Sequence, residues 1–156
     1  MISNALAIAT RLLVKPFEGY HKRLPDGGCK AYPDPATRGD PWTIGYGSTG
    51  PDIDKDTVWS QDYAEQRLMQ HMLYFATKLL ILSPSLARAS DRRFAAVISF
   101  AYNCGLGNYR ISTFKKRVDA GDWEGAQQEI VKWNKAAGRV LPGLTRRRAA
   151  EAAFLA

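Results

Sequence analysis

Apolar residues recur at helical spacing along most of the chain, and this pattern breaks off in one segment near its start. An apolar position every three or four residues is typical of an amphipathic helix with one face in a core. The pattern predicts helices over residues 3–14, 60–82, 90–104, 112–119, 122–133 and from about 145 onward. Four breaks are expected where proline or glycine interrupts it, at Pro16, Ser83-Pro84, Gly105 and Gly121.

Residues 19–50 lack the helical pattern and are rich in turn-forming residues. Seven of the thirteen glycines and four of the eight prolines lie there. Two short stretches between these turns, 29–32 and 42–46, predict a β-hairpin or a three-stranded sheet. We therefore expect one α+β domain over residues 1–156, with a small β lobe at about 19–50. The larger helical lobe is expected at about 57–156 plus the N-terminal helix, and a ligand is expected in a cleft between the lobes.

The composition is that of a globular protein with a basic surface. Hydrophobic residues make up 46% of the 156 residues and charged residues 24%, and 22 basic against 15 acidic residues give a net charge of +7. This charge favours a polyanionic partner, such as nucleic acid, anionic lipid or an acidic bacterial envelope. The apolar run 5–14 is broken by Arg11 and lacks the flanking features of a signal peptide, so no stable membrane insertion is expected.

Cysteines, histidines and one basic triplet offer little chemistry by themselves. Cys29 and Cys104 are too few for a disulfide framework, which leaves one bridge or two free thiols as alternatives. His21 and His71 stand in no metal-ligand spacing, so no metal site is expected. The triplet 146–148 fans around a predicted helix and is expected to face solvent or the envelope.

Three residues near the glycine-rich segment are candidates for catalysis. Glu18 ends the first helical pattern beside apolar residues, which disfavour the charged form of a carboxyl group and suit a general acid. Asp34 lies between two prolines, which present its carboxylate on a rigid backbone. Thr43 lies in a predicted strand beside Gly45 and Gly47, which let a ligand approach closely. Taken singly, each has a structural alternative: a solvated glutamate, a turn aspartate and a strand threonine.

Taken in order, these residues resemble the active-site signature of phage lysozymes (endolysins), glycoside hydrolase family 24. The matching pieces are Glu18-Gly19, Tyr32-Pro33-Asp34 and Thr43-Ile44-Gly45-Tyr46-Gly47. Further segments similar to the family follow at 100–105, 107–109, 112–113, 133–134 and 141–148. The resemblance thus extends from Glu18 to about residue 151. One departure is the separation of 16 residues between Glu18 and Asp34, which adds a loop over 21–29.

The resemblance implies a lysozyme-like fold and a bacteriolytic enzyme. Its substrate would be bacterial peptidoglycan, cleaved by hydrolysis of the β-1,4 bond between N-acetylmuramic acid and N-acetylglucosamine. Glu18 would protonate the leaving oxygen, and Asp34 with Thr43 would activate a water, in an inverting reaction without cofactor or metal. A monomer without nucleic-acid partners is expected, accumulating in the host cytoplasm until it is released to act on the cell wall.

The resemblance also assigns substrate contacts. It places them at Thr49, Tyr102, Ser112 and Gln128, with Tyr32, Tyr46 and Asn103 lining or supporting the cleft. Three alternatives stay open: a lytic transglycosylase acting on the same bond, a chitinase-like enzyme, and a non-catalytic basic protein that binds the envelope or nucleic acid.

Overall fold

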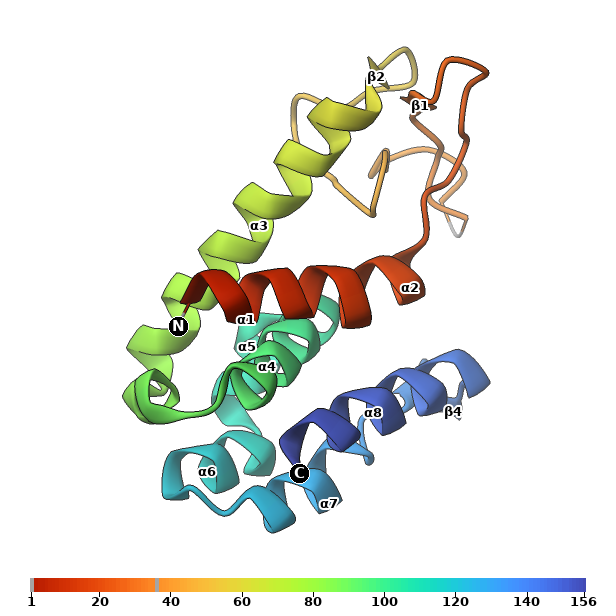
Figure 1. Ribbon diagram of the computed structural model, residues 1–156. Coiled ribbons are helices and arrows are strands. Elements are labelled where there is room, and N and C mark those ends of the chain that lie inside the picture. Colours follow the sequence, from red (N-terminus) through yellow and green to blue (C-terminus); the bar gives the residue numbers. More distant parts are fainter. Residues whose placement is uncertain (1, 36) are drawn as a thin grey trace. The chain divides into compact units, whose positions relative to one another are not determined.

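The computed structural model of the chain describes residues 2–35 and 37–156, which divide into two compact units. The helical unit contains the chain up to Phe17 together with Met72–Ala156, and the β unit contains Glu18–His71. The elements, in chain order and as labelled in Figure 1, are α1 (Ile2–Ile8), η1 (Ala9–Val14), α2 (Lys15–Glu18), β1 (Cys29–Lys30), β2 (Val58–Trp59), α3 (Gln61–Leu82), η2 (Pro84–Arg88), α4 (Asp91–Cys104), α5 (Leu106–Ile111), α6 (Thr113–Ala120), α7 (Trp123–Ile130), β3 (Lys135–Ala136), β4 (Arg139–Val140) and α8 (Pro142–Leu155).

The N-terminal helix continues past the proline that was predicted to end it. α1, η1 and α2 follow one another without a break from Ile2 to Glu18 (Figure 1). η1 is a π-helical segment, and Pro16 follows it as the second residue of α2. A proline lacks the N–H donor and crowds the preceding turn of a regular α-helix, and the π-helical hydrogen-bonding pattern directly before Pro16 accommodates it. The prediction at Pro16 was therefore wrong, and Glu18 is the last helical residue.

The sheet of the β unit has two strands, and one comes from outside the segment where strands were predicted. β1 pairs antiparallel with β2, with Cys29 opposite Trp59 and Lys30 opposite Val58. The predicted stretch 42–46 forms isolated bridges instead of a strand, from Thr43 to Tyr32 and from Ile44 to Ser48. Figure 1 shows β1 and β2 side by side next to the start of α3. Strands of two residues are too short for an alternating pattern to predict.

The predicted helix starts are confirmed by their caps. Ser60 Oγ accepts the N–H of Tyr63 at the start of α3. Ser90, Ser112 and Asp122 cap α4, α6 and α7 through their side chains. These are the residue types that satisfy the free N–H groups of a first helical turn.

The core of the helical unit forms around α4. Its residues 94–101 are all buried, and it packs against α1, η1 and α8. The apolar stripe predicted for α3 is also buried at Ala64, Leu68, Met72, Ala76 and Leu79. The pattern missed α5, η2 and the β3–β4 hairpin, and it placed the start of α8 three residues late.

The basic triplet contradicts its predicted exposure at two of three positions. Arg147 and Arg148 are only 3% and 0% exposed, and both contact the buried Glu151. Arg148 Nε lies 2.8 Å from Glu151 Oε2, and Arg147 Nε lies 3.3 Å from Oε1. Ser99 Oγ donates a third bond of 2.6 Å to Oε1. Because Glu151 follows the arginines by three and four residues, α8 brings all three to one face.

Two further expectations concern the membrane and the cysteines. Within residues 2–35 and 37–156, the structure has no helix with the length and apolar character needed to cross a bilayer. Cys29 is buried and Cys104 half-buried, and both are free thiols in the structure. The alternative of a bridge between them is therefore not supported.

We expect Glu151→Ala to destabilise the protein by about 3–5 kcal/mol, because it leaves two buried guanidinium groups without their carboxylate. Glu124→Ala, at an exposed glutamate of α7, is the matched control and should change the free energy of unfolding by less than about 0.5 kcal/mol. Urea denaturation measures both. Equal losses in the two variants would contradict the structural role of the Arg147–Arg148–Glu151 cluster.

Candidate active site

Glu18 contacts the loop of the β unit formed by residues 45–47, called the glycine loop below. Gly19 follows it with φ +72°, a conformation that favours glycine and turns the chain away from the helix. A Cβ atom at Gly47 would stand 3.3 Å from Glu18 Oε2, and Gly47 itself has φ +87°. Both observations explain why a glycine is needed at position 47: a side chain there would crowd the carboxyl group.

The backbone bridge between Tyr32 and Thr43 brings two further candidates to the same region. Tyr32 N donates to Thr43 O at 2.9 Å, and Thr43 N donates to Tyr32 O at 3.0 Å. Burial raises the pKa of the Tyr32 phenol, and the negative charge of Glu18 raises this pKa further. Glu18 is therefore within electrostatic reach of Tyr32, whose bridge partner is Thr43.

Asp34 lies in a tight turn directly after this bridge. Its Oδ1 accepts the N–H of Thr37 at 3.0 Å, and its own N–H donates to Gly39 O at 3.0 Å. Arg38 N donates back to Asp34 O at 2.7 Å. These bonds hold the half-buried carboxylate on a fixed backbone, as its flanking prolines predicted.

His21 is a supporting residue that sequence reasoning missed. Its Nε2 lies 2.9 Å from the carbonyl oxygen of Glu18, and its ring meets the Tyr32 ring edge-on at 5.5 Å between centroids. It thus links the end of α2 to Tyr32. The only relevant signal in the sequence was its place three residues after Glu18.

Tyr46 supports the site from within the β unit. It is 6% exposed, its ring packs on Tyr20 at 5.0 Å between centroids, and its hydroxyl donates to Glu65 Oε1 at 3.2 Å. Tyr20 in turn donates to Gly27 O at 2.8 Å. Of the two roles foreseen for Tyr46, lining and support, these contacts favour support.

The other predicted contacts belong mostly to the helical unit. Thr49 is exposed in the β unit, and Gln128 is exposed on α7. Tyr102 packs its ring edge-on against Phe75 at 5.6 Å between centroids. Asn103 Oδ1 accepts a bond of 2.8 Å from Arg148 Nη2, which ties it to the buried cluster. The roles of these residues toward a substrate stay predictions.

Ser112 already has a structural role. It is 5% exposed, its hydroxyl donates to Tyr109 O at 2.7 Å, and it accepts the N–H of Lys115 at 3.0 Å. Its hydroxyl therefore caps α6, and its predicted contact with a substrate remains untested.

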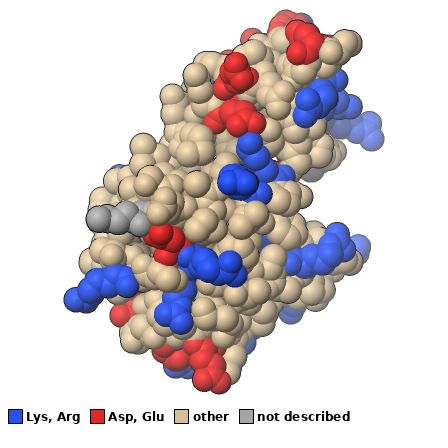
Figure 2. All heavy atoms as spheres, in the orientation of Figure 1, with Lys and Arg blue, Asp and Glu red and all other residues tan. Residues whose placement is uncertain are grey.

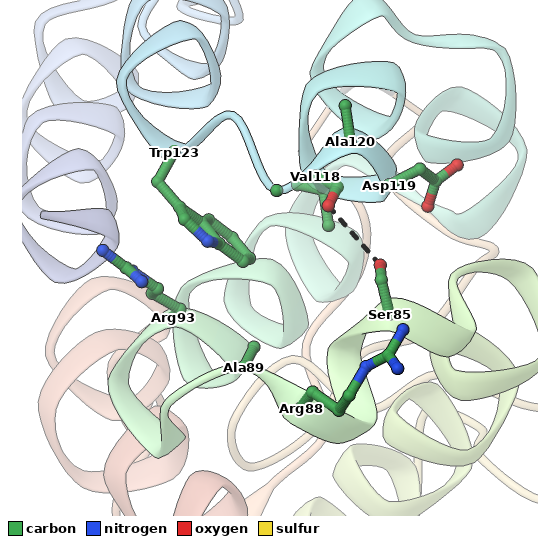
Figure 3. Close-up of a pocket in the computed structure, with 9 residues that line it drawn as sticks. Ser85, Arg88, Ala89, Arg93, Val118, Asp119, Ala120 and Trp123 are labelled. Carbon is green, nitrogen blue, oxygen red and sulfur yellow. Dashed lines mark hydrogen bonds between the residues drawn. The ribbon is translucent and has the colours of Figure 1, made fainter.

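Cavities of the helical unit involve few of the predicted residues. One of about 420 Å³ is lined by Asn103 and Cys104, together with Trp133 and the two residues of β3. Another, of about 270 Å³, lies among η2, α4, α6 and α7 (Figure 3) and contains none of the predicted site residues. Its Arg93 donates to Leu155 O at 3.0 Å and lies over the Trp123 ring at 4.9 Å, which are structural contacts. Across the part of the chain that the structure describes, no group of three or more histidines, cysteines or carboxylates could hold a metal ion.

Comparison with known proteins identifies the family to which this chain belongs. The family model "Phage lysozyme" matches residues 17–151, and this chain belongs to that family. All the predicted site residues fall inside the matched range.

Relatives and solved structures agree with this assignment. The chain is 37% identical over 142 residues to the endolysin of Bacillus phage B103, covering 89% of this chain and 49% of the relative. It is 33% identical to the endolysin of Acyrthosiphon pisum secondary endosymbiont phage 1, covering 92% of each. Its fold is similar to the muramidase domain of SpmX from Asticaccaulis excentricus, with TM-score 0.76, 25% identity and coverage of 97% and 93%. The endolysin from Escherichia coli O157:H7 phage FAHEc1 has TM-score 0.74, 27% identity and coverage of 97% and 90%. The chain spans about half the length of the Bacillus phage relatives.

We expect Glu18→Gln to lower the pKa of Tyr32, because the substitution removes the nearby negative charge. The pKa should stay above the ordinary tyrosine value of about 10, since burial is the larger cause of the rise. NMR titration of the labelled tyrosine ring measures it. Glu65→Gln, beside Tyr46, is the control and should leave Tyr32 unchanged. An unaltered Tyr32 titration in Glu18→Gln would contradict the proximity of the two side chains.

Proposed function

We propose that this chain is a lysozyme domain that lyses bacterial cells by hydrolysing peptidoglycan. The bond cleaved is the β-1,4 link between N-acetylmuramic acid and N-acetylglucosamine. The observation that carries the proposal is the arrangement of the β unit: Glu18 against Gly47 and near Tyr32, with Thr43 on the backbone bridge and Asp34 in the adjoining turn. The same chain belongs to the phage lysozyme family.

Glu18 acts as the general acid in this proposal. It stands at the end of a helix, and Gly47, which has no side chain to crowd its carboxyl group, leaves room for a sugar oxygen to approach. Protonation of the glycosidic oxygen turns a poor leaving group into a neutral alcohol. His21 positions Glu18 through its backbone carbonyl.

Asp34 and Thr43 act on the water. Asp34 accepts the proton of the attacking water, and the hydroxyl of Thr43, which both donates and accepts, orients that water. In inverting glycosidases the two carboxyl groups stand ~6.5–9.5 Å apart to admit the water. The chemistry uses two carboxyl groups and one water, and we propose no metal or organic cofactor for it.

The remaining predicted residues hold the glycan in this proposal. The proposed glycan contacts are Thr49, Tyr32, Tyr102, Asn103, Ser112 and Gln128. The hydroxyl of Ser112 would have to serve the substrate while capping α6, so its contribution is expected to be the smallest.

The charge distribution suits an acidic polymer. The helical unit carries 16 basic and 6 acidic residues, and the β unit carries 6 basic and 9 acidic residues. Figure 2 shows the basic side chains in several separate clusters on the displayed face, along with acidic ones. Such scattered charge raises the encounter rate with a carboxylate-rich wall at low salt. We propose a monomer that accumulates in the host cytoplasm, acts on the wall after release, and binds no nucleic acid.

We expect Glu18→Gln to lower kcat on purified peptidoglycan by at least about 10²- to 10⁴-fold, because the amide cannot supply the proton. Glu124→Gln, on the exposed surface of α7, is the matched control and should keep the parent rate. Reducing ends released per unit time measure both variants. A Glu18→Gln enzyme that works at the parent's rate would overturn the proposal, and so would a control that fails equally.

A further inference from the structure

Half of the basic residues of the β unit line one cavity. The β unit has an excess of acidic residues, and its six Lys and Arg side chains include Lys22, Lys30 and Lys55. These three surround a cavity of about 340 Å³ that lies wholly within this unit. Three lysines gathered in the acidic part of the chain call for a specific explanation.

A backbone hydrogen bond holds two of these three lysines close together. Lys30 N donates to Lys22 O at 3.1 Å, so the two lysines are held side by side. Lys22 adopts φ +52°, an unusual value for a residue other than glycine. Lys30 also lies in β1 opposite Val58 of β2, and Lys55 precedes that strand by three residues.

Within the part of the chain that the structure describes, two of the three ammonium groups have no acidic partner. Lys55 Nζ lies 3.0 Å from Asp56 Oδ2 in an exposed ion pair. Among residues 2–35 and 37–156, neither Lys22 nor Lys30 forms an ion pair or a side-chain hydrogen bond. The cavity therefore has a surplus positive charge, which favours an anionic ligand.

The rest of the lining is apolar and aromatic. Ala31, Pro33, Tyr32 and Trp42 complete the cavity. Aromatic faces and small apolar side chains suit methyl groups and chain carbons better than a fully hydrated ion. The expected ligand thus combines a negative charge with an apolar portion, as a short peptide carboxylate does.

The cavity adjoins the proposed catalytic residues. Pro33 is bonded to Asp34 and Trp42 to Thr43, so two lining residues are each one residue, about 3.8 Å between Cα atoms, from a catalytic candidate. Tyr32 lines the cavity and also lies within electrostatic reach of Glu18. A ligand here and a glycan at Asp34 can belong to one substrate molecule.

We propose that this cavity binds a carboxylate of the peptide stem that peptidoglycan carries on its muramic acid. Lys22 and Lys30 hold the carboxylate, and Trp42 and Tyr32 contact the methyl groups and carbons of the stem. The inference rests on the proposed function and deepens it, because it makes the stem part of the recognised substrate. A phosphate-bearing wall polymer has similar charge, but its hydroxylated backbone offers fewer apolar groups to Trp42, Tyr32, Ala31 and Pro33, so the stem is the better fit.

The test compares Lys22→Gln/Lys30→Gln with the parent on two substrates: glycan strands with their stems and the same strands stripped of stems by an amidase. We expect KM to rise about three- to tenfold on the strands with stems, at unchanged kcat, and less than about twofold on the stripped strands. Lys78→Gln/Lys116→Gln removes two exposed lysines of the helical unit and controls for overall charge. An equal rise on both substrates, or the same rise in the control, would overturn the inference.

A binding measurement without turnover separates this inference from the proposed function. We expect a free stem tripeptide to shift the indole N–H signal of Trp42 in the NMR spectrum of Glu18→Gln, and Lys22→Gln/Lys30→Gln to weaken that binding by the same three- to tenfold. Poly(glycerol phosphate) is the competing probe. A Trp42 shift with the phosphate polymer and none with the tripeptide would overturn the inference. Full activity of Glu18→Gln would overturn the proposed function instead.

Discussion

Two backbone hydrogen bonds between Tyr32 and Thr43 hold the proposed site together. They join two loops that otherwise contain mostly glycine, proline and turns. Asp34 follows Tyr32 by two residues, and Gly45 and Gly47 follow Thr43 by two and four residues. If these two hydrogen bonds broke, the Asp34 turn, the hydroxyl of Thr43 and the loop that contacts Glu18 would no longer be held in fixed positions relative to one another. Catalysis depends on placing such groups to within a fraction of an ångström, so the loss of these two hydrogen bonds would lower activity more than it would lower stability.

The rest of the β unit supports the bridge through a few polar and aromatic contacts. His21 ties the carbonyl of Glu18 to the ring of Tyr32, and Tyr46 fixes the glycine loop to Glu65. Within the helical unit, the Arg147–Arg148–Glu151 cluster has a comparable role, because its arginines reach Ser99, Asn103 and Cys104 on α4. In this cluster the buried Glu151 Oε1 accepts hydrogen bonds from Ser99, Arg147 and Arg148.

Sequence patterns predicted what depends on neighbours along the chain. The apolar stripe of α3, the helix starts at residues 60 and 112, and the fixed backbone at Asp34 all arise within a few residues. The sequence patterns gave wrong predictions where the structure depends on contacts between residues far apart in the sequence. The strand that pairs with β1 consists of Val58 and Trp59, and the buried Arg148 contacts Asn103 and Cys104, which no local pattern connects to it. Pro16 also misled the prediction, because a π-helical segment precedes it. The candidate site was found through spacing similar to a known family, and geometry then added His21, the contact between Gly47 and Glu18, and the lysine-lined cavity.

The account depends on the claim that water, activated by Asp34 and Thr43, completes the cleavage that Glu18 begins. Digestion of peptidoglycan in water labelled with oxygen-18 tests this directly, with NMR of the fresh digest and mass spectrometry of the fragments. The account predicts one heavy oxygen at each new reducing end, formed first as the α-anomer, because inversion of a β-bond yields α. Unlabelled fragments that end in a 1,6-anhydro ring would contradict it, since they form without water.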